Sequence, residues 1–309
     1  MLHHRYRARA TRVRQTSSNS DSNYWPQRRD GHHLPMEIIL MLAVNGGLTL
    51  DEDVVKQIAS QLADAAREVT LALFDQSLAH HRKADNSPVT QADRDAEQAM
   101  RSILAERVPA HGILGEEFGD VRTDAEYVWV LDPIDGTKAF ITGRPLWGTL
   151  IGLMHRGEPY FGLLDLSPLD QRLAGFSQHA QINGEPCRTS DCRQLADARL
   201  GCTSPDMFKP GAELDAFLRV RDAAWFCSYG GDCSAYAAVA RGALDVVVEA
   251  DLQPYDYLPL VPVIEGAGGK ITDWNGRALS LGCGVAQVVA TANPELHTAA
   301  LALLATQRA

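Results

Sequence analysis

Two aspartates at the end of an apolar segment are the residues of this sequence best suited to chemistry. Asp132 and Asp135 follow the run Val128–Leu131, which is typical of a buried strand, and Pro133 and Ile134 separate them. Carboxylates three residues apart around a stiff turn can both point at one cation, and hard divalent cations prefer oxygen ligands. On its own such a pair is more simply explained as a strand followed by an Asp-Pro or Asp-Gly turn. The interpretation therefore depends on what accompanies the pair.

Gly136 and Thr137 come directly after the second aspartate and suggest how an anion is held. Pro133 fixes one φ angle of the turn, and Gly136 lets the backbone change direction sharply. If a helix begins at Thr137, the N–H groups of Gly136 and Thr137 lie at its positive end. A phosphate oxygen is a suitable acceptor for both.

Other carboxylates stand at the ends of predicted elements elsewhere in the chain. Glu116 ends a short apolar strand, Glu249 ends a valine-rich strand, and Asp256 precedes an apolar segment. Asp93 lies three residues after Thr90 at the start of a predicted helix. A capping box between these two residues explains Asp93 without any ligand role.

Five of these acids, if they converge, need counter-charges. Unneutralised carboxylates in one place repel one another by several kcal/mol, so a shared site implies divalent metal ions, and two or three Mg²⁺ fit best. No His or Cys stands among them in a ligand pattern, which argues against zinc. The five are Asp93, Glu116, Asp132, Asp135 and Asp256.

Length and composition indicate a globular protein with a large core, since 45% of the 309 residues are hydrophobic. The longest early apolar stretch, residues 38–44, is shorter than the roughly 20 residues that cross a bilayer, so we expect no membrane segment. Six cysteines without a C-x-x-C pair suggest reduced thiols in a cytoplasmic protein. The net charge is −10, and it is −15 once the basic residues 1–35 are set aside, which disfavours nucleic-acid binding.

Residues 1–35 are rich in Arg, Ser, Asn and Gln and show no apolar period, so we expect a disordered extension. Met36 and Met41 are plausible true starts. The basic, Ser-containing segment also has some features of an organellar presequence, but it lacks the apolar core of a secretion signal. We expect residues 36–309 to form a single domain, with an N-terminal α+β half over about 50–195 and a C-terminal α/β half over about 196–305.

Apolar periodicity predicts the elements that position the acids. Spacings of three and four residues predict an amphipathic helix over about 50–78, and a polar, hairpin-like segment over 83–93 leads into a second helix. The segment 258–264 contains Pro259 and Pro262, so its helix propensity is low and we expect no regular helix there. The predicted strands include 112–119, 147–153, 159–166, 199–203, 225–229, 244–249, 271–274 and 287–291, and the later helices are 212–223, 233–241 and 294–304.

Three ordered motifs resemble the signatures of the inositol monophosphatase superfamily. Members of this superfamily are Mg²⁺-dependent, lithium-sensitive phosphatases. They are G-E-E at 115–117, W-V-L-D-P-I-D-G-T at 129–137, and P-Y-D with E-G-A-G-G within 254–269, and the resemblance covers about residues 50–305. It implies an α/β (α+β) fold, a layered α-β-α-β-α sandwich that is usually dimeric, with the metals between its two halves. We therefore expect a homodimer that acts on a small phosphorylated substrate.

The same resemblance implies roles for individual residues. The expected metal ligands are Glu116, Asp132, the Ile134 carbonyl, Asp135, Asp256 and, as a further candidate, Asp93. Thr137, with Glu116, would position and deprotonate the attacking water, and the Gly136 and Thr137 amides would hold the phosphate. The metals would lower the pKa of the water and stabilise the leaving alkoxide, without a phosphoenzyme.

Finer features resemble the histidinol-phosphate phosphatase branch. Tyr255 stands where most members have Trp, and Y-G-G-D-C-S-A-Y occupies 229–236. Histidinol carries an ammonium and an imidazole, so its pocket should offer acids, and Asp232 and Glu249 are the candidates. The alternative explanation for these two acids is structural, with Asp232 as a helix N-cap and Glu249 as a solvated strand end. The alternatives are inositol or other sugar phosphates as substrates and, in another class, a non-catalytic regulator that works through protein contacts.

Overall fold

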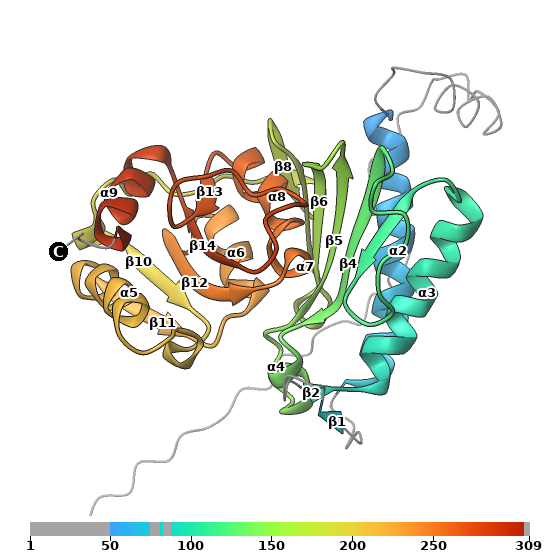
Figure 1. Ribbon diagram of the computed structural model, residues 1–309, viewed down its shortest axis with the longest axis horizontal. Helices are drawn as coiled ribbons and strands as arrows, with labels where there is room; N and C mark the ends of the chain where they lie inside the picture. Colours follow the sequence, from blue (N-terminus) through green and yellow to red (C-terminus); the bar gives the residue numbers. More distant parts are fainter. Residues whose placement is uncertain (1–49, 75–80, 83–87, 306–309) are drawn as a thin grey trace, which may run out of the picture.

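The structure, a computed structural model, describes residues 50–74, 81–82 and 88–305. The predicted extension 1–35 lies outside the described residues. Figure 1 shows five layers, in which two helices cover a large sheet, a helical layer separates that sheet from a smaller one, and two further helices cover the outer face of the smaller sheet. The predicted α-β-α-β-α sandwich is therefore confirmed.

The first layer is the helix pair α2 (Glu52–Leu73) and α3 (Gln91–Arg107), and both predicted helices are confirmed. The side chain of Asp51 caps α2 by accepting from the Asp53 backbone N–H. Thr90 and Asp93 form the predicted capping box at the start of α3. Strands β1 (His81–Arg82) and β2 (Pro88–Val89) pair antiparallel before α3, in line with the expected hairpin.

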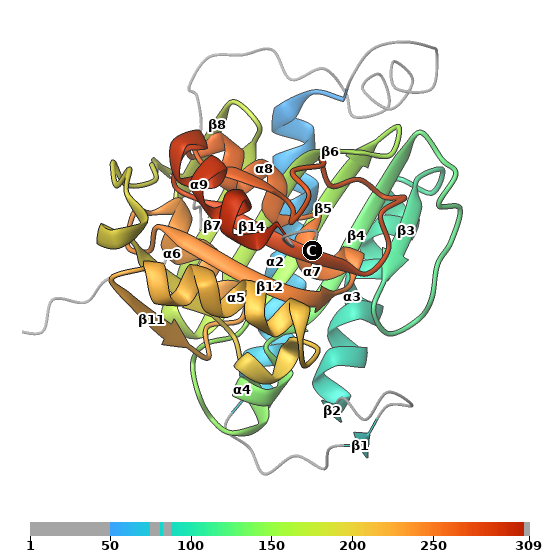
Figure 2. The same cartoon turned by 60° about the vertical axis from the view of Figure 1, so that its left-hand side comes forward.

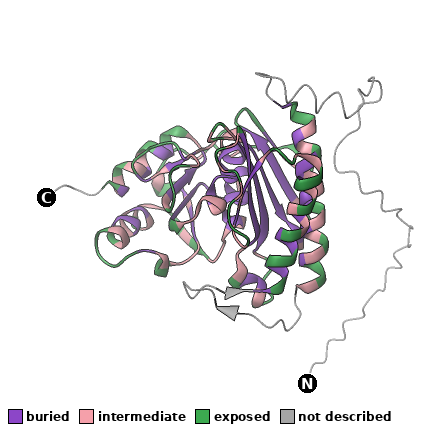
Figure 3. Cartoon of the chain, turned by 45° about the vertical axis from the view of Figure 1, so that its right-hand side comes forward, coloured by how far each residue is buried: buried purple, intermediate pink, exposed green. Residues whose placement is uncertain are grey.

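The larger sheet has seven strands in sequence order, of which only the first pair is parallel. Strand β4 (Tyr127–Asp135) is buried along nearly its whole length. Helix α3 covers one face of the sheet there, and the helical layer between the two sheets covers the other. Figure 3 shows the strands as buried and the outer sides of α2 and α3 as exposed. The other strands are β3 (Gly112–Gly115), β5 (Gly148–His155), β6 (Glu158–Leu166), β7 (Gln171–Phe176), β8 (His179–Ile182) and β9 (Glu185–Pro186).

The smaller sheet has five strands in the order β11-β10-β12-β14-β13, with β10 parallel to both of its neighbours. Helices α5 (Ala212–Ala223) and α9 (Pro294–Leu304) cover its outer face, as Figure 2 shows in front of β12. No helix among the described residues is long and apolar enough to cross a membrane. The strands are β10 (Arg199–Cys202), β11 (Phe226–Tyr229), β12 (Val246–Leu252), β13 (Lys270–Asp273) and β14 (Ala286–Thr291).

The middle layer consists of α6 (Cys233–Ala240), α7 (Pro254–Tyr257) and α8 (Leu260–Gly266). The expectation against a regular helix over 258–264 is wrong. Pro259 occupies the N-cap of α8 and Pro262 its third position, where a backbone N–H has no partner within the helix. Both prolines therefore fit the first turn without breaking a hydrogen bond.

A row of three glycines brings α8 against the larger sheet. Gly152, Gly162 and Gly175 are neighbours across β5, β6 and β7. A Cβ atom at Gly162 would overlap the carbonyl oxygen of Pro259, and one at Gly175 would lie 2.7 Å from the carbonyl oxygen of Pro262. The backbone of α8 therefore rests directly on the backbone of the sheet. This contact fixes the position of α7, the preceding helix.

Candidate active site

The end of β4 carries the two aspartates that the sequence singles out. Pairing with β5 is regular to Asp132, shifts in register, and resumes at Asp135, so the two residues flank a bulge. The buried hydroxyl of Thr149 donates to the Pro133 carbonyl at 2.8 Å and holds the bulge from the neighbouring strand. The sheet thus fixes both carboxylates at its edge.

Asp256 joins this pair from α7. Its Oδ2 accepts from the Gln253 backbone N–H at 2.7 Å, which closes the first turn of the short helix. One carboxylate oxygen each of Asp132, Asp135 and Asp256 lies within 4.8 Å of the others. Three residues from distant parts of the chain therefore form one compact acidic cluster.

The protonation of this cluster differs from that of ordinary carboxylates. Burial, together with the charges of Glu116 and Glu249, raises the pKa of Asp256 to about 8, although the hydrogen bond from the Gln253 N–H lowers it. Burial and the nearby carboxylates also raise the pKa of Asp132 and of Asp135 well above the usual value. Without a bound cation, the negative charges of these buried carboxylates are therefore poorly compensated.

The same cluster has the properties of a cation site. Asp132 Oδ1 is buried and has no hydrogen-bond partner among the described residues, which costs free energy unless another group binds it. All the clustered donors are carboxylate oxygens, the type that hard divalent cations prefer. The residues present therefore fit a divalent metal ion.

Glu116 and Asp93 extend the acidic region along the other side of Asp132. Burial raises the pKa of Asp93 to about 6, with Glu116 among the contributing charges, and the carboxylate of Glu116 also raises the pKa of Asp132. Asp93 Oδ2 accepts from the backbone N–H and the hydroxyl of Thr90, at 2.8 and 2.6 Å. Capping accounts for these contacts, as the sequence suggested, and the charge that links Asp93 to the acidic region is that of Glu116.

Glu97 is a site-supporting residue that the sequence analysis missed. It is fully buried on α3 and accepts from the backbone N–H groups of Glu117 and Phe118, at 2.8 and 3.2 Å. These contacts hold the segment that follows β3 and carries Glu116. The signal was present, because Glu97 lies on the same helix face as the buried Met100 and Leu104, where an acid needs partners.

The residues after Asp135 form the expected turn and helix. Gly136 has φ 91° and is the N-cap of α4 (Thr137–Ile141). A side chain at Gly136 would contact Leu146 and Trp147, so both φ and space favour glycine here. The Thr137 hydroxyl donates to the Ile134 carbonyl at 3.1 Å. The two N–H groups that the sequence predicted to face an anion therefore start a helix next to the carboxylates.

The second half of the chain closes the site at α6. The Cys233 backbone N–H donates to Asp135 Oδ2 at 2.5 Å, which joins the start of α6 to the end of β4. Asp232 precedes it with φ 44°, and Glu249 accepts from the Thr203 N–H and the Tyr236 hydroxyl, each at 2.9 Å. Burial raises the pKa of Glu249 to about 7.

A cavity of about 120 Å³ lies between these groups. Its wall includes two members of the carboxylate cluster and both acids that the sequence proposed for substrate binding. Apolar side chains of Met207, Leu252 and Leu260 complete it. Its acidic members are Asp135, Asp232, Glu249 and Asp256.

The raised pKa values predict how the metal-free protein responds to pH. Asp256 has a pKa of about 8 in the folded chain against a usual 3.8, so the folded state binds the proton more tightly. The contribution of Asp256 to stability is then fully present in acid and is lost as the pH rises from about 4 through 8. We expect the Tm of chelator-treated protein to be lower at pH 8.5 than at pH 6, with Mg²⁺ raising it more at the higher pH.

Calorimetry at both pH values, with and without Mg²⁺, measures this effect. Asp256→Asn should make the Tm of the metal-free protein less dependent on pH, whereas Asp191→Asn, at an exposed position, should not. A Tm in chelator that rises between pH 6 and pH 8.5 would contradict the prediction.

This fold and this acidic edge define a phosphatase scaffold of the sugar-phosphatase type, and sequence comparison identifies the family. The profile of the inositol monophosphatase family matches residues 51–309, and the chain belongs to this family. The bifunctional phosphatase IMPL2 of Arabidopsis thaliana, described as chloroplastic, is 47% identical over 79% of this chain and 73% of its own.

Two further comparisons agree with this assignment. A histidinol-phosphatase of Mycobacterium tuberculosis is 36% identical over 72% of this chain and 88% of its own. The solved structure of an inositol monophosphatase from Zymomonas mobilis superposes with a TM-score of 0.75, at 40% identity, over 83% of this chain and 99% of its own. The protein is thus a phosphatase of the inositol monophosphatase family.

Proposed function

We propose that this protein is a Mg²⁺-dependent phosphatase that hydrolyses L-histidinol phosphate to L-histidinol and phosphate, with two or three Mg²⁺ per subunit. The observation that carries the proposal is the acidic cavity next to the carboxylate cluster. Histidinol has an ammonium group and an imidazole, and an inositol ring has only neutral hydroxyls. An acidic wall beyond the metal site suits the cationic alcohol. The relatives named histidinol-phosphatase support the same choice.

We assign the metal to the carboxylates of Glu116, Asp132, Asp135 and Asp256 and to the Ile134 carbonyl, with Asp93 as a further candidate. The bound cations would lower the pKa of water and neutralise charge on the phosphate and the leaving oxygen. Within the chain, Glu97 holds the segment that carries Glu116, and Thr149 holds the bulge between Asp132 and Asp135.

In this proposal Thr137 orients the water that attacks phosphorus. Its hydroxyl proton is donated to the Ile134 carbonyl, so its oxygen is left as an acceptor for a proton of that water. Glu116 is the base that removes the other proton of this water. The N–H groups of Gly136 and Thr137 bind a phosphate oxygen at the start of α4, which fixes phosphorus in line with the water.

The two substrate-binding acids have different roles in this proposal. Both carboxylate oxygens of Glu249 are engaged by Thr203 and Tyr236, so it shapes the wall and adds negative charge. The carboxylate of Asp232 lines the cavity, and burial raises its pKa while the cations of Lys138 and Arg144 lower it. The net pKa of Asp232 is raised, and a bound ammonium group would favour its ionised form. Asp232 is therefore the residue that binds the amino alcohol.

Replacement of Asp232 tests substrate recognition separately from chemistry. Asp232→Asn keeps the shape and tolerates the positive φ but removes the charge. We expect KM for histidinol phosphate to rise about tenfold, the size of a lost charge-assisted hydrogen bond, with kcat nearly unchanged. Steady-state kinetics with p-nitrophenyl phosphate, which has no ammonium group, should show no such rise.

Asp251→Asn is the matched control, because Asp251 is exposed and also has a positive φ, of 61°. Equal effects of the two substitutions, or an equal loss with the aryl phosphate, would contradict a recognition role. The substrate itself is tested by kcat/KM for histidinol phosphate against inositol 1-phosphate in Mg²⁺ buffer. A preference for the inositol ester would favour the inositol monophosphatase activity, and no turnover of either would favour a regulator that acts through protein contacts.

We also propose that residues 36–309 act as a single phosphatase domain and that two copies form a homodimer. Light scattering of the full chain and of a chain that begins at Met36 would test both statements. A lower Tm of the shorter chain would show that the extension stabilises the domain.

A further inference from the structure

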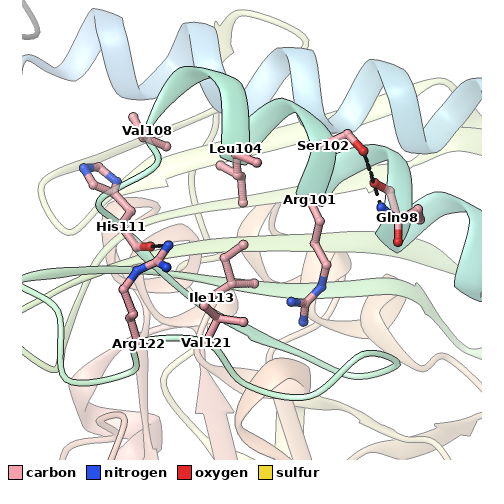
Figure 4. A pocket seen from close by; sticks show the side chains of 10 residues that line it. Gln98, Arg101, Ser102, Leu104, Val108, His111, Ile113, Val121 and Arg122 are labelled. Atoms are coloured by element: carbon pink, nitrogen blue, oxygen red, sulfur yellow. Dashed lines mark hydrogen bonds between the residues drawn. The ribbon is translucent and has the colours of Figure 1, made fainter.

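A second, larger cavity lies away from the acidic cluster, between α3 and the edge of the seven-stranded sheet. Its volume is about 360 Å³, within the range of about 300–1,000 Å³ that is usual for small-molecule sites. Leu104 of α3 and Val108, the residue after α3, face Ile113 of β3 and Val121 of the following segment. Figure 4 shows this apolar patch with the side chains of Arg101 and Arg122 on either side.

The segment that closes the cavity is held in an unusual conformation. Ile113 and Val121 exchange two backbone hydrogen bonds, of 2.7 and 2.8 Å, and Arg122 follows with φ 47°. Non-glycine residues seldom adopt such a φ, which costs on the order of 1 kcal/mol or more. This turn directs the guanidinium of Arg122 back over the cavity, where it donates to the carbonyls of Pro109 and His111, both at 2.8 Å.

Positive charge at the cavity is only partly compensated. Arg101 forms an ion pair with Glu97, with 2.7 Å between Nε and Oε1. Arg122 forms no ion pair with a carboxylate of the described residues. Both hydrogen bonds of Arg122 come from Nη2, so its Nε and Nη1 groups have no acceptor among the described residues. An apolar cavity with one uncompensated guanidinium fits a ligand with an apolar body and a single negative charge.

The cavity is linked to the acidic cluster by Arg101. Its Nη2 donates to the Gly119 carbonyl at 2.5 Å, and its Nε donates to Glu97, which in turn accepts from the N–H groups of Glu117 and Phe118. One hydrogen-bonded unit thus connects the wall of the cavity to the segment that carries Glu116. A ligand that packs on this wall would stabilise the segment, because it binds the arrangement in which these hydrogen bonds are made.

We propose that this cavity is a second binding site, for a small organic carboxylate with an apolar body, and that its occupation stabilises the segment 115–119. The proposal does not depend on which phosphate ester the enzyme hydrolyses. It requires that both the charge and the apolar body of the ligand contribute to binding.

Isothermal titration of the full chain with 4-phenylbutyrate tests the proposal, with 4-phenylbutanamide and acetate as probes that lack the charge or the apolar body. We expect 4-phenylbutyrate to bind at least about tenfold more tightly than either. Arg122→Met should reduce its affinity about tenfold or more. Arg156→Met is the matched control, because Arg156 is also an exposed arginine with positive φ, of 54°, and does not line the cavity.

Ala105→Phe places a ring in the cavity from an exposed position of α3 and should abolish binding while the Tm is retained. Hydrogen–deuterium exchange tests the link, since saturating 4-phenylbutyrate should slow exchange in a peptide that contains Glu117 and Phe118. Equal binding of the acid and its amide, or binding that survives Ala105→Phe, would overturn the site. Unchanged exchange on saturation would overturn the link, and displacement of 4-phenylbutyrate by inorganic phosphate of equal affinity would overturn the ligand class.

Discussion

Asp135→Asn is expected to lower kcat for any phosphate monoester by about 10³-fold or more. Asp135 lies in the three-carboxylate cluster and also accepts from the Cys233 N–H at the start of α6. The substitution removes a negative ligand from a site built for divalent cations, which removes several kcal/mol of transition-state stabilisation. Initial rates at saturating Mg²⁺, with the Tm measured in parallel, separate this effect from misfolding.

Asp191→Asn, at an exposed position far along the chain, should have no effect on kcat. Exhaustive chelation of the unsubstituted enzyme should have an effect as large as Asp135→Asn. Activity that survives either treatment would rule out metal-dependent catalysis at this cluster.

Gly162→Ala is expected to be the most damaging small substitution outside the cluster. The added methyl group overlaps the Pro259 carbonyl oxygen, and both backbones are fixed by their own hydrogen bonds. We expect the free energy of unfolding to fall by about 3 kcal/mol, at the upper end of typical overpacking effects. Asp256 lies three residues before Pro259, so its displacement should also lower kcat about 10²-fold. Denaturant unfolding and initial rates measure the two effects.

Gly282→Ala is the control for Gly162→Ala. No atom lies within 4 Å of a Cβ at Gly282, and its φ is not in the left-handed region, so stability and kcat should stay unchanged. A Gly162→Ala variant with unchanged stability would show that α8 does not rest on the sheet as closely as described.

Much of the fold follows from local patterns in the sequence. The apolar run before Asp132 predicted a buried strand. The three- and four-residue spacing predicted α2, and the Thr90–Asp93 capping box predicted the start of α3, and the structure confirms all three. Asp132 and Asp135 were found because both lie at the end of one strand. The family resemblance predicted that Asp256 joins them, since no local pattern reports a contact between residues more than 100 positions apart. The distance of no more than 4.8 Å between their oxygens comes from the structure.

The remaining features depend on contacts that a linear pattern does not contain. Helix α8 forms despite its prolines because Pro259 and Pro262 fall in its first turn, and the exact start of a helix is the least predictable part of it. Glu97 acts on backbone N–H groups twenty residues away. The three glycines look unremarkable in sequence and become related only when β5, β6 and β7 pair.

The buried position of Cys233 determines how the protein reacts with thiol reagents. Burial and the negative charges of Asp135 and Asp232 raise the pKa of the Cys233 thiol well above its usual range, so it remains protonated next to the cluster. Because only the thiolate is a good nucleophile, alkylating agents and peroxide should leave this thiol intact. Cys283 is the exposed cysteine among the described residues, so a fluorophore or spin label can be attached there while the active-site thiol stays unmodified.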